Sequence, residues 1–270
     1  MSQTVPEKSK LLSESERLGK TLLSSISHEI RTPLTVIQSA TSNLAAYGHS
    51  DLSPFQKAMV AEIQEASERL NRFVGKVLDM SRLESGRLQP NFGHYYLSDL
   101  VTMAEAQTRK ELAQHKVIID LPPELPRLWI DFELMLHALT NLLSNAAVHT
   151  PAGTEVRLSV KVEDGAVLFI VADRGPGIPP ESIPHLFEKF YRAPSARAGG
   201  TGLGLSLVEG YVEAHGGQVK AENRAGGGAA FTIRLWGART PSPCDGIPSA
   251  KSPLHRDDGK FVLTNTTPED

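Results

Sequence analysis

Apolar residues recur every three or four positions near the start of the chain, which indicates an amphipathic helix from about residue 11 to residue 46. After the polar stretch AYGHSDLSP, a second apolar run predicts another long helix that ends near residue 87. Two long helices with a short connection form an antiparallel hairpin. The second run consists of Phe55, Ile63, Ala66, Leu70, Phe73, Val77 and Met80.

A hairpin with a single apolar seam cannot cover that seam by itself. Pairing with a second copy of the chain into a four-helix bundle would bury it. The pattern therefore predicts a homodimer.

From Pro90 onward the pattern changes to shorter helical stretches that alternate with β-rich runs, which predicts a separate α+β domain. Asp164 and Gly165 separate two runs rich in β-branched residues, a combination typical of a hairpin turn. We expect helices at about 97–113, 131–148 and 202–215, strands at 117–121, 154–162 and 166–173, and a second hairpin over 218–236.

These patterns divide the chain into four segments. The first is short and polar, and the last is dense in Pro, Ser and charged residues, so we expect both to be disordered. The segments are a flexible start at 1–10, a helical hairpin at 11–87, a second domain at 90–236 and a disordered tail at 237–270.

Composition and charge narrow the class of protein. The 270 residues are 40% hydrophobic, as in ordinary globular proteins, and carry a formal net charge of -3, which argues against nucleic-acid or membrane-surface binding. A single cysteine, Cys244, excludes a disulfide within the chain and a cysteine-built metal site. We expect a cytoplasmic protein, or the soluble part of a membrane-associated sensor, without membrane contact of its own.

Two polar motifs suggest a nucleotide site. In NLLSNAAVHT, Asn141 and Asn145 are four residues apart on one helix face, and an Asn oxygen is a suitable ligand for Mg²⁺. In DRGPGIP, Asp173 ends a predicted strand and can accept a hydrogen bond from an adenine amino group, while Gly175 and Gly177 permit close approach of a ligand. Taken singly, the first motif also fits solvated surface and the second a plain turn.

Two further motifs follow. FEKFYR, residues 187–192, has aromatic side chains that would anchor one end of a mobile loop, although such residues are as ordinary in a core. GGTGLGLSL is a glycine cluster that opens an amphipathic helix, so backbone N–H groups and the positive helix end would face a phosphate. A dinucleotide fold is disfavoured because no βαβ unit surrounds the cluster.

In this order the four motifs resemble the N, G1, F and G2 boxes of sensor histidine kinases, and SHEIRTP resembles the H box of that family. The resemblance covers residues 11–236 and is greatest to potassium-responsive, Kdp-type kinases. It implies a dimerisation hairpin followed by an α+β sandwich that binds ATP, the Bergerat fold. It also implies transfer of phosphate from ATP to the chain and then to an aspartate on a response regulator receiver domain, with phosphatase activity on that partner.

The resemblance assigns roles residue by residue. His28 would accept the phosphate, Glu29 would take the proton of its other ring nitrogen, and Thr32 would orient a water for dephosphorylation. Asn145, with Asn141 nearby, would hold Mg²⁺. The remaining assignments are Asp173, Gly175 and Gly177 for adenine and its pocket, and Gly200, Thr201, Gly202, Leu203 and Gly204 for the phosphates, with 192–200 as a flexible lid.

Pro33 lies one turn after His28 and weakens the helix by about 3 kcal/mol, because it removes one hydrogen bond and crowds the carbonyl of Glu29. Our hypothesis is that this weak point is a hinge between kinase and phosphatase arrangements. A fixed kink is the alternative.

The chain departs from the family pattern at Val148, where a Lys or Arg is usual. Arg192 or Arg197 could supply the missing charge. Two other functions stay open: a nucleotide-binding dimeric scaffold without kinase activity, favoured by Val148, and an ATPase of the gyrase and heat-shock chaperone superfamily, disfavoured because Glu133 is poorly placed as its base.

Overall fold

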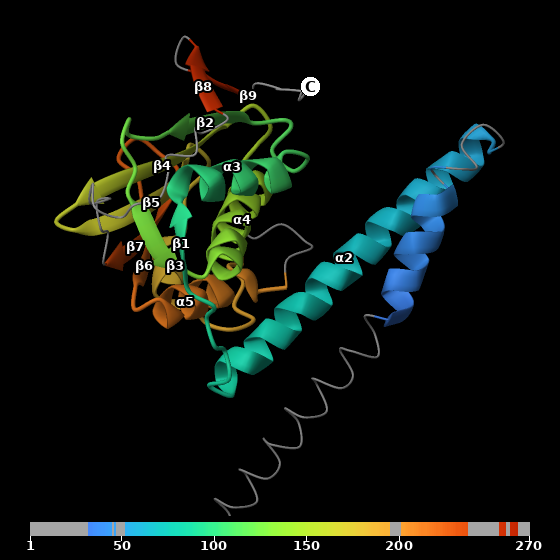
Figure 1. Ribbon diagram of the computed structural model, residues 1–270, viewed down its shortest axis with the longest axis horizontal. Helices are drawn as coiled ribbons and strands as arrows, with labels where there is room; N and C mark the ends of the chain where they lie inside the picture. Colours follow the sequence, from blue (N-terminus) through green and yellow to red (C-terminus); the bar gives the residue numbers. More distant parts are fainter. Residues whose placement is uncertain are drawn as a thin grey trace, which may run out of the picture. The chain divides into compact units, whose positions relative to one another are not determined.

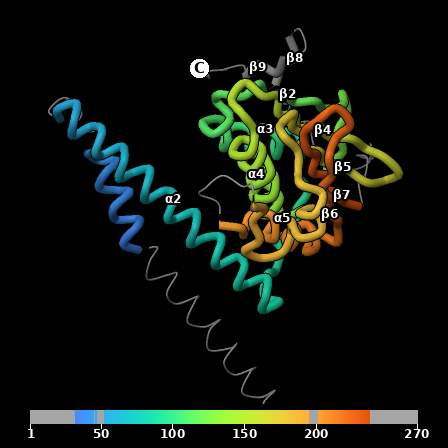
Figure 2. The backbone as a smooth tube through the Cα atoms, turned by 180° about the vertical axis from the view of Figure 1, so that it is seen from behind, coloured from blue at the N-terminus to red at the C-terminus, as the bar shows by residue number. Residues whose placement is uncertain are grey.

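The computed structural model describes residues 32–44, 46, 52–194 and 201–236, together with the backbone of 254–257 and 260–263. Residues 32–44 are helical, in agreement with the predicted first helix, whose earlier part lies outside the described residues. This helix lies beside α2 in both backbone views (Figures 1 and 2). Within the described residues, no helix combines the length and apolar character of a membrane span.

The second predicted helix is α2, Pro54–Glu84. Its start is stabilised by a capping box: the Ser53 hydroxyl accepts a hydrogen bond from the Gln56 amide at 3.3 Å, and the Gln56 side chain accepts one from the Ser53 amide at 2.8 Å. Pro54 occupies the first turn, where the amide hydrogen that proline lacks has no helical partner.

The apolar positions of α2 divide between two partners. Phe55, Ile63 and Leu70 are exposed in the single chain, as expected of residues that a second copy of the chain would cover. Val77 and Met80 instead pack against the core of the second domain. The prediction of one continuous dimer seam is therefore wrong at the end of α2, because the second domain covers the last turns of the helix.

Five strands of the described chain form a mixed sheet in the order β2-β4-β5-β7-β6. Strand β2 pairs with β4 in parallel, and the other neighbours are antiparallel. The strands are β2 (Lys116–Asp120), β4 (Glu155–Glu163), β5 (Ala166–Asp173), β6 (Gln218–Asn223) and β7 (Ala229–Trp236).

Three helices form the second layer of the sandwich: α3 (Leu97–Thr108), α4 (Phe132–His149) and α5 (Gly204–Ala214) (Figure 1). A short 3-10 helix, η1 (Pro180–His185), lies between β5 and α5 in the chain. Helix α4 is central, since it contacts α3, α5 and the sheet. Its fully buried residues include Met135, Leu139, Leu142 and Leu143. The predicted α+β sandwich is confirmed.

The predicted hairpin between β4 and β5 is also confirmed. Glu163 pairs with Ala166 across the turn. Asp164 and Gly165 both have positive φ, 50° and 72°, as a two-residue turn of the mirror-image type requires.

Two features differ from the expected elements. Helix α3 ends at Thr108, and 109–113 form turns; the Thr108 hydroxyl donates to the Ala104 carbonyl at 2.8 Å, in the last turn of the helix. The strands β1 (Gly93–Tyr96) and β3 (Arg127–Ile130) form an antiparallel ribbon that we did not predict. Each has only four residues, too few to show a clear period.

The end of α2 is attached to α5 and to the segment before it by specific contacts. The Tyr211 hydroxyl donates to Asp79 Oδ2 at 2.6 Å, and burial together with this carboxylate raises the pKa of Tyr211 well above its ordinary value. Lys189 forms an ion pair with Glu84 at 2.7 Å. A Cβ atom on Gly210 would lie 2.5 Å from Leu83, so glycine permits this close packing.

The chain divides into two compact units, residues 1–239 and 240–270. In the second unit, β8 (Leu254–Asp257) pairs antiparallel with β9 (Lys260–Leu263). These eight positions differ from the disorder expected for 237–270, since residues such as Phe261 and Val262 favour strands. The rest of the predicted tail lies outside the described residues.

Prediction for the sheet: Leu158→Ala should destabilise the protein by about 2–5 kcal/mol, because the side chain is fully buried in β4 and leaves a cavity. Val162→Ala is the control, since Val162 lies on the same strand with 43% of its surface exposed. Urea unfolding measures both. A similar loss in the two variants would contradict the described packing of β4.

Candidate functional site

The asparagines of the first motif lie on the exposed side of α4. Asn141 and Asn145 are one turn apart, and both are half-buried. The amide group of Asn141 donates to the His137 carbonyl at 2.9 Å, which leaves its Oδ1 atom directed elsewhere. This Oδ1 atom lies 3.5 Å from the position that a Cβ would take on Gly204. The structure thus brings the first and fourth motifs together.

Asp173 ends β5 and is held rigidly, with 7% of its surface exposed. Its Oδ1 atom accepts hydrogen bonds from the Gly175 amide at 2.7 Å and the Ala229 amide at 3.2 Å. Within the described residues no hydrogen bond is recorded for Oδ2. One oxygen therefore fixes the orientation of the carboxylate while the other stays available.

Two residues that the sequence analysis missed hold the backbone of Asp173. The Arg224 guanidinium donates to the Asp173 carbonyl at 2.6 Å. Gly228, with φ of 91°, lies so close that a Cβ atom would be 2.1 Å from the same carbonyl oxygen. In the sequence, Gly226 to Gly228 indicated only a turn, and nothing pointed to their contact with the second motif.

Hydrogen bonds connect the loop after Asp173 to the end of β6. The Asn223 side chain accepts from the Ile178 amide and donates to the Ile178 carbonyl, each at 2.7 Å. Gly177 lies against this pair, since a Cβ there would be 2.7 Å from Asn223 Oδ1. A Cβ on Gly175 would be 2.6 Å from the methyl group of Thr150. Both glycines of the second motif thus occupy positions without room for a side chain.

The described ends of the predicted lid meet at Phe190 and Gly202. The Phe190 amide donates to the Gly202 carbonyl at 3.0 Å, and a Cβ on Gly202 would be 2.6 Å from Phe190 backbone. Phe187 packs against the core and anchors the third motif as predicted, whereas Phe190 is 69% exposed and does not. Residues 195–200, including Arg197 and Gly200, lie outside the described residues.

The helix after the glycine cluster begins at Gly204, two residues later than predicted, because Gly202 has a φ of 70° that no right-handed helix accommodates. The Leu203 amide donates to the Thr201 hydroxyl at 3.3 Å, and the Leu203 side chain is buried. The first turn of α5 contains no acidic residue. Its amides form a positive helix end suited to phosphate.

A cation from another helix lies at this end of α5. Lys76 on α2 places its Nζ atom 4.0 Å from the Cβ position of Gly204. Burial lowers the pKa of Lys76, and the charge of Glu111 partly opposes this effect. Val148, the departure from the family pattern, is exposed on α4. Lys76 was not expected from the sequence, because nothing local distinguishes it from Lys57, the other lysine of α2.

The predicted phosphate acceptor and its neighbour, His28 and Glu29, lie outside the described residues. Thr32 begins the described part of the first helix and is exposed, and Pro33 follows it within that helix. The assignment of these residues to the acceptor site stays a prediction, as does the hinge at Pro33.

Two family models match the chain. Residues 130–239 match the histidine kinase-, DNA gyrase B-, and HSP90-like ATPase domain, and residues 20–86 match the His Kinase A (phospho-acceptor) domain. The chain belongs to the sensor histidine kinases. The first match contains both asparagines of α4, Asp173 and the start of α5, so this family's ATPase domain is the setting of the candidate site.

Individual histidine kinases show the same likeness. The chain is 31% identical over 232 residues to the sensor protein KdpD of Clostridium acetobutylicum and 33% identical over 230 residues to KdpD of Escherichia coli. Each alignment covers 85% of this chain but only 26% of the relative. The crystal structure of full-length ShkA in complex with AMPPNP matches with a TM-score of 0.67 and 27% identity, over 83% of this chain and 47% of that one.

Prediction for the site: Gly228→Ala should destabilise the kinase by about 1–3 kcal/mol more than Gly227→Ala, because only the first new methyl group collides with Asp173. Both glycines have φ above 90°, so the backbone strain is matched. Thermal unfolding measures the difference. Equal melting temperatures would show that the wall behind Asp173 is not tightly packed.

Proposed function

We propose that this kinase core binds ATP with Mg²⁺, transfers the γ-phosphoryl group to its own His28, and passes it to an aspartate on the receiver domain of a response regulator. The observation that carries the proposal is the meeting of Asn141 with the first residue of α5, at 3.5 Å from the Gly204 Cβ position. That contact joins candidate metal ligands to a helix end suited to phosphate. ShkA, a histidine kinase of similar structure, is described in complex with the ATP analogue AMPPNP.

The adenine end of the site is Asp173. Since Oδ1 already accepts two backbone amides, Oδ2 is the atom that accepts a hydrogen bond from the adenine amino group. The two glycines after it, Gly175 and Gly177, let Thr150 and Asn223 pack directly against the backbone of the loop that borders the base. Thr150, whose methyl group lies next to Gly175, contributes to the wall of this pocket.

The phosphate end of the site is formed by α4 and α5. Asn145, with Asn141, offers amide oxygens, which are ligands that Mg²⁺ accepts alongside water and phosphate oxygens. When bound, the ion neutralises charge on the transferred phosphoryl group. The backbone amides from Gly202 to Gly204 bind the phosphates, and the buried Leu203 side chain holds those amides in place.

The acceptor step takes place on the hairpin. The neutral imidazole of His28 attacks the γ-phosphorus, a nitrogen–phosphorus bond forms, and the bond from that phosphorus to the oxygen of ADP breaks. Glu29 accepts the proton from the other ring nitrogen. Thr32, one turn after His28, orients a water for the phosphatase reaction on the response regulator. Since acceptor and nucleotide lie on different domains, one domain must move to the other in each cycle.

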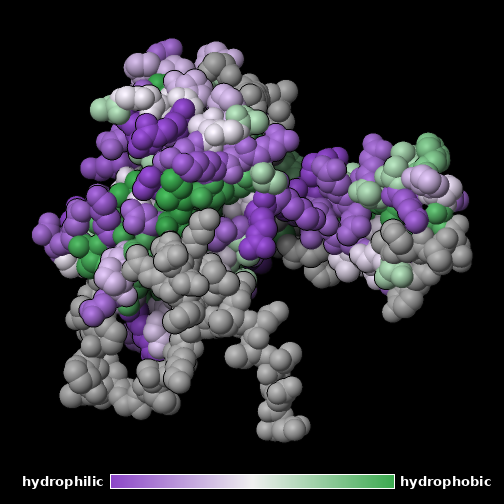
Figure 3. Space-filling model, turned by 90° about the horizontal axis from the view of Figure 1, so that it is seen from above, coloured by the Kyte–Doolittle hydropathy of each residue, from purple (hydrophilic) through white to green (hydrophobic). Residues whose placement is uncertain are grey.

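The same hairpin accounts for a homodimer, which the phospho-acceptor domain implies. Hydrophobic side chains lie at the surface of the hairpin at the end away from the sheet (Figure 3). They include Phe55, exposed over 72% of its surface, and Ile63. A four-helix bundle with a second copy would bury them.

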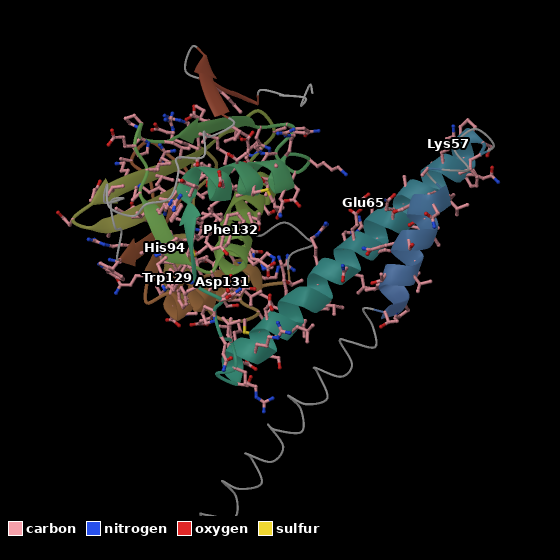
Figure 4. All side chains as sticks on the ribbon, in the orientation of Figure 1. Lys57, Glu65, His94, Trp129, Asp131 and Phe132 are labelled. Atoms are coloured by element: carbon pink, nitrogen blue, oxygen red, sulfur yellow. The ribbon has the colours of Figure 1, made fainter. Side chains whose placement is uncertain are left out.

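Prediction for the kinase reaction: purified protein incubated with γ-labelled ATP and Mg²⁺ should acquire acid-labile, alkali-stable label, as a phosphohistidine does. His28→Gln and Asn145→Ala should abolish it by removing the acceptor and the metal ligand. His94→Gln, which changes an exposed histidine beside Trp129 (Figure 4), should retain full label. ATP turnover without label would favour the ATPase alternative, and binding without turnover the scaffold.

Prediction for base recognition: Asp173→Asn should lower the affinity for ATP about tenfold or more while affecting GTP less. The asparagine must keep its oxygen toward the amides of Gly175 and Ala229, so it presents an NH₂ group to the base. Adenine offers a donor there and guanine an acceptor, and an unpaired buried donor costs about 1–3 kcal/mol. Calorimetry measures both nucleotides, with Asp164→Asn, in the exposed turn, as control. An unchanged preference for ATP would contradict the assignment.

A further inference from the structure

The phosphate end of the site lacks a cation on its own helix. In the position where the family usually has Lys or Arg, α4 has Val148, which is exposed and cannot neutralise charge. A nucleoside triphosphate with one Mg²⁺ still carries net negative charge, and phosphoryl-transfer sites commonly add a lysine or arginine. A cation that serves the start of α5 must therefore come from another element.

Lys76 meets that requirement. It lies on α2, outside the ATPase domain match at 130–239. Its Nζ atom is nevertheless 4.0 Å from the position that a Cβ would take on Gly204. Asn141 Oδ1 lies 3.5 Å from that same position. The last turns of α2 hold it there, because Met80 belongs to the core of the ATPase domain and Asp79 accepts a hydrogen bond from Tyr211.

The surroundings of Lys76 are unfavourable for a cation without a bound anion. Its side chain is half-buried and lies at the positive end of α5. Within the described residues no carboxylate forms an ion pair with it; the anion that acts on it most, Glu111, accepts a hydrogen bond from Ser144 instead. Burial accordingly lowers the pKa of Lys76. An anion with several oxygens would satisfy both Lys76 and the helix end.

We propose that Lys76 of the dimerisation hairpin binds the phosphates of ATP at the start of α5 and replaces the cation that α4 lacks at position 148. This proposal rests on ATP binding at the site described above. The nucleotide pocket then contains residues of two domains, the hairpin and the ATPase domain. Bound phosphates then strengthen the attachment of α5 to α2, and the contact must break when the ATPase domain moves toward His28.

The test compares wild-type protein with Lys76→Met, Lys76→Arg and Lys57→Met by calorimetric titration with ATP, ADP and adenosine. Lys57 is the matched control, because it lies on α2 at the far end from the ATPase domain (Figure 4). Lys76→Met should weaken ATP binding roughly tenfold, as expected for one charge-assisted hydrogen bond. The affinity for ADP should fall less, and the affinity for adenosine should not change. Lys76→Arg should restore most of the affinity, and Lys57→Met should match wild type.

Thermal unfolding without nucleotide supplies a second readout. Removal of an unpaired cation at a positive helix end should leave the melting temperature of Lys76→Met unchanged or higher, while the stabilisation by added ATP shrinks. ATP affinity equal to wild type would overturn the proposal, as would an equal loss for ATP and adenosine, which would indicate a damaged fold. Wild-type protein that binds none of the three ligands would overturn the proposed function and this inference together. ATP binding that depends on Lys76 without formation of phosphohistidine would overturn the kinase reaction alone.

Discussion

Burial of one face of α4 between the sheet and its neighbouring helices is the constraint on which the nucleotide site depends. Leu139, Leu142 and Leu143 are fully buried, so the rotation of the helix about its axis is determined. Asn141 and Asn145 then lie away from these leucines, and Asn141 Oδ1 lies next to the start of α5. A polar side chain buried on that face without a hydrogen-bond partner would lower the free energy of unfolding by several kcal/mol. The polar and apolar positions of α4 are therefore clearly separated.

At the other end of the site, the constraint is satisfaction of buried polar groups. Asp173 is almost fully buried, and each of its fixed contacts uses a backbone group or a residue from the β6–β7 hairpin. Arg224 and Gly228 are as important to its position as the motif in which it lies. The two hydrogen bonds between the Asn223 side chain and the Ile178 backbone add a second connection between the β6–β7 hairpin and the loop after Asp173. The proposed adenine end of the site is thus held by several fixed contacts, which suits recognition of a planar base.

Helix α2 takes part in both proposed roles of the chain, dimerisation and nucleotide binding. Its first turns expose apolar residues such as Phe55, which the proposed dimer would bury. Its last turns contact α5 through Asp79 and Leu83 and pair with Lys189 through Glu84. Apolar residues are needed for both contacts, which explains why one continuous pattern serves two partners. The helix therefore joins the proposed dimer interface to the proposed nucleotide site.

The sequence by itself determined the features that depend on neighbouring residues. These are the period of α2, the Asp164–Gly165 turn, the helix expected at 131–148 and the motifs after β5 and before α5. Helix period and turn chemistry act over a few positions. Tertiary structure alone decided which distant residues complete the site. Arg224 reaches Asp173 across 51 positions, and Lys76 reaches Gly204 from another domain. No local pattern encodes such contacts, because they follow from strand register and from helix packing. The same holds for the short strands β1 and β3, which pair with each other across more than 30 positions and place Leu128 and Ile130 in the core.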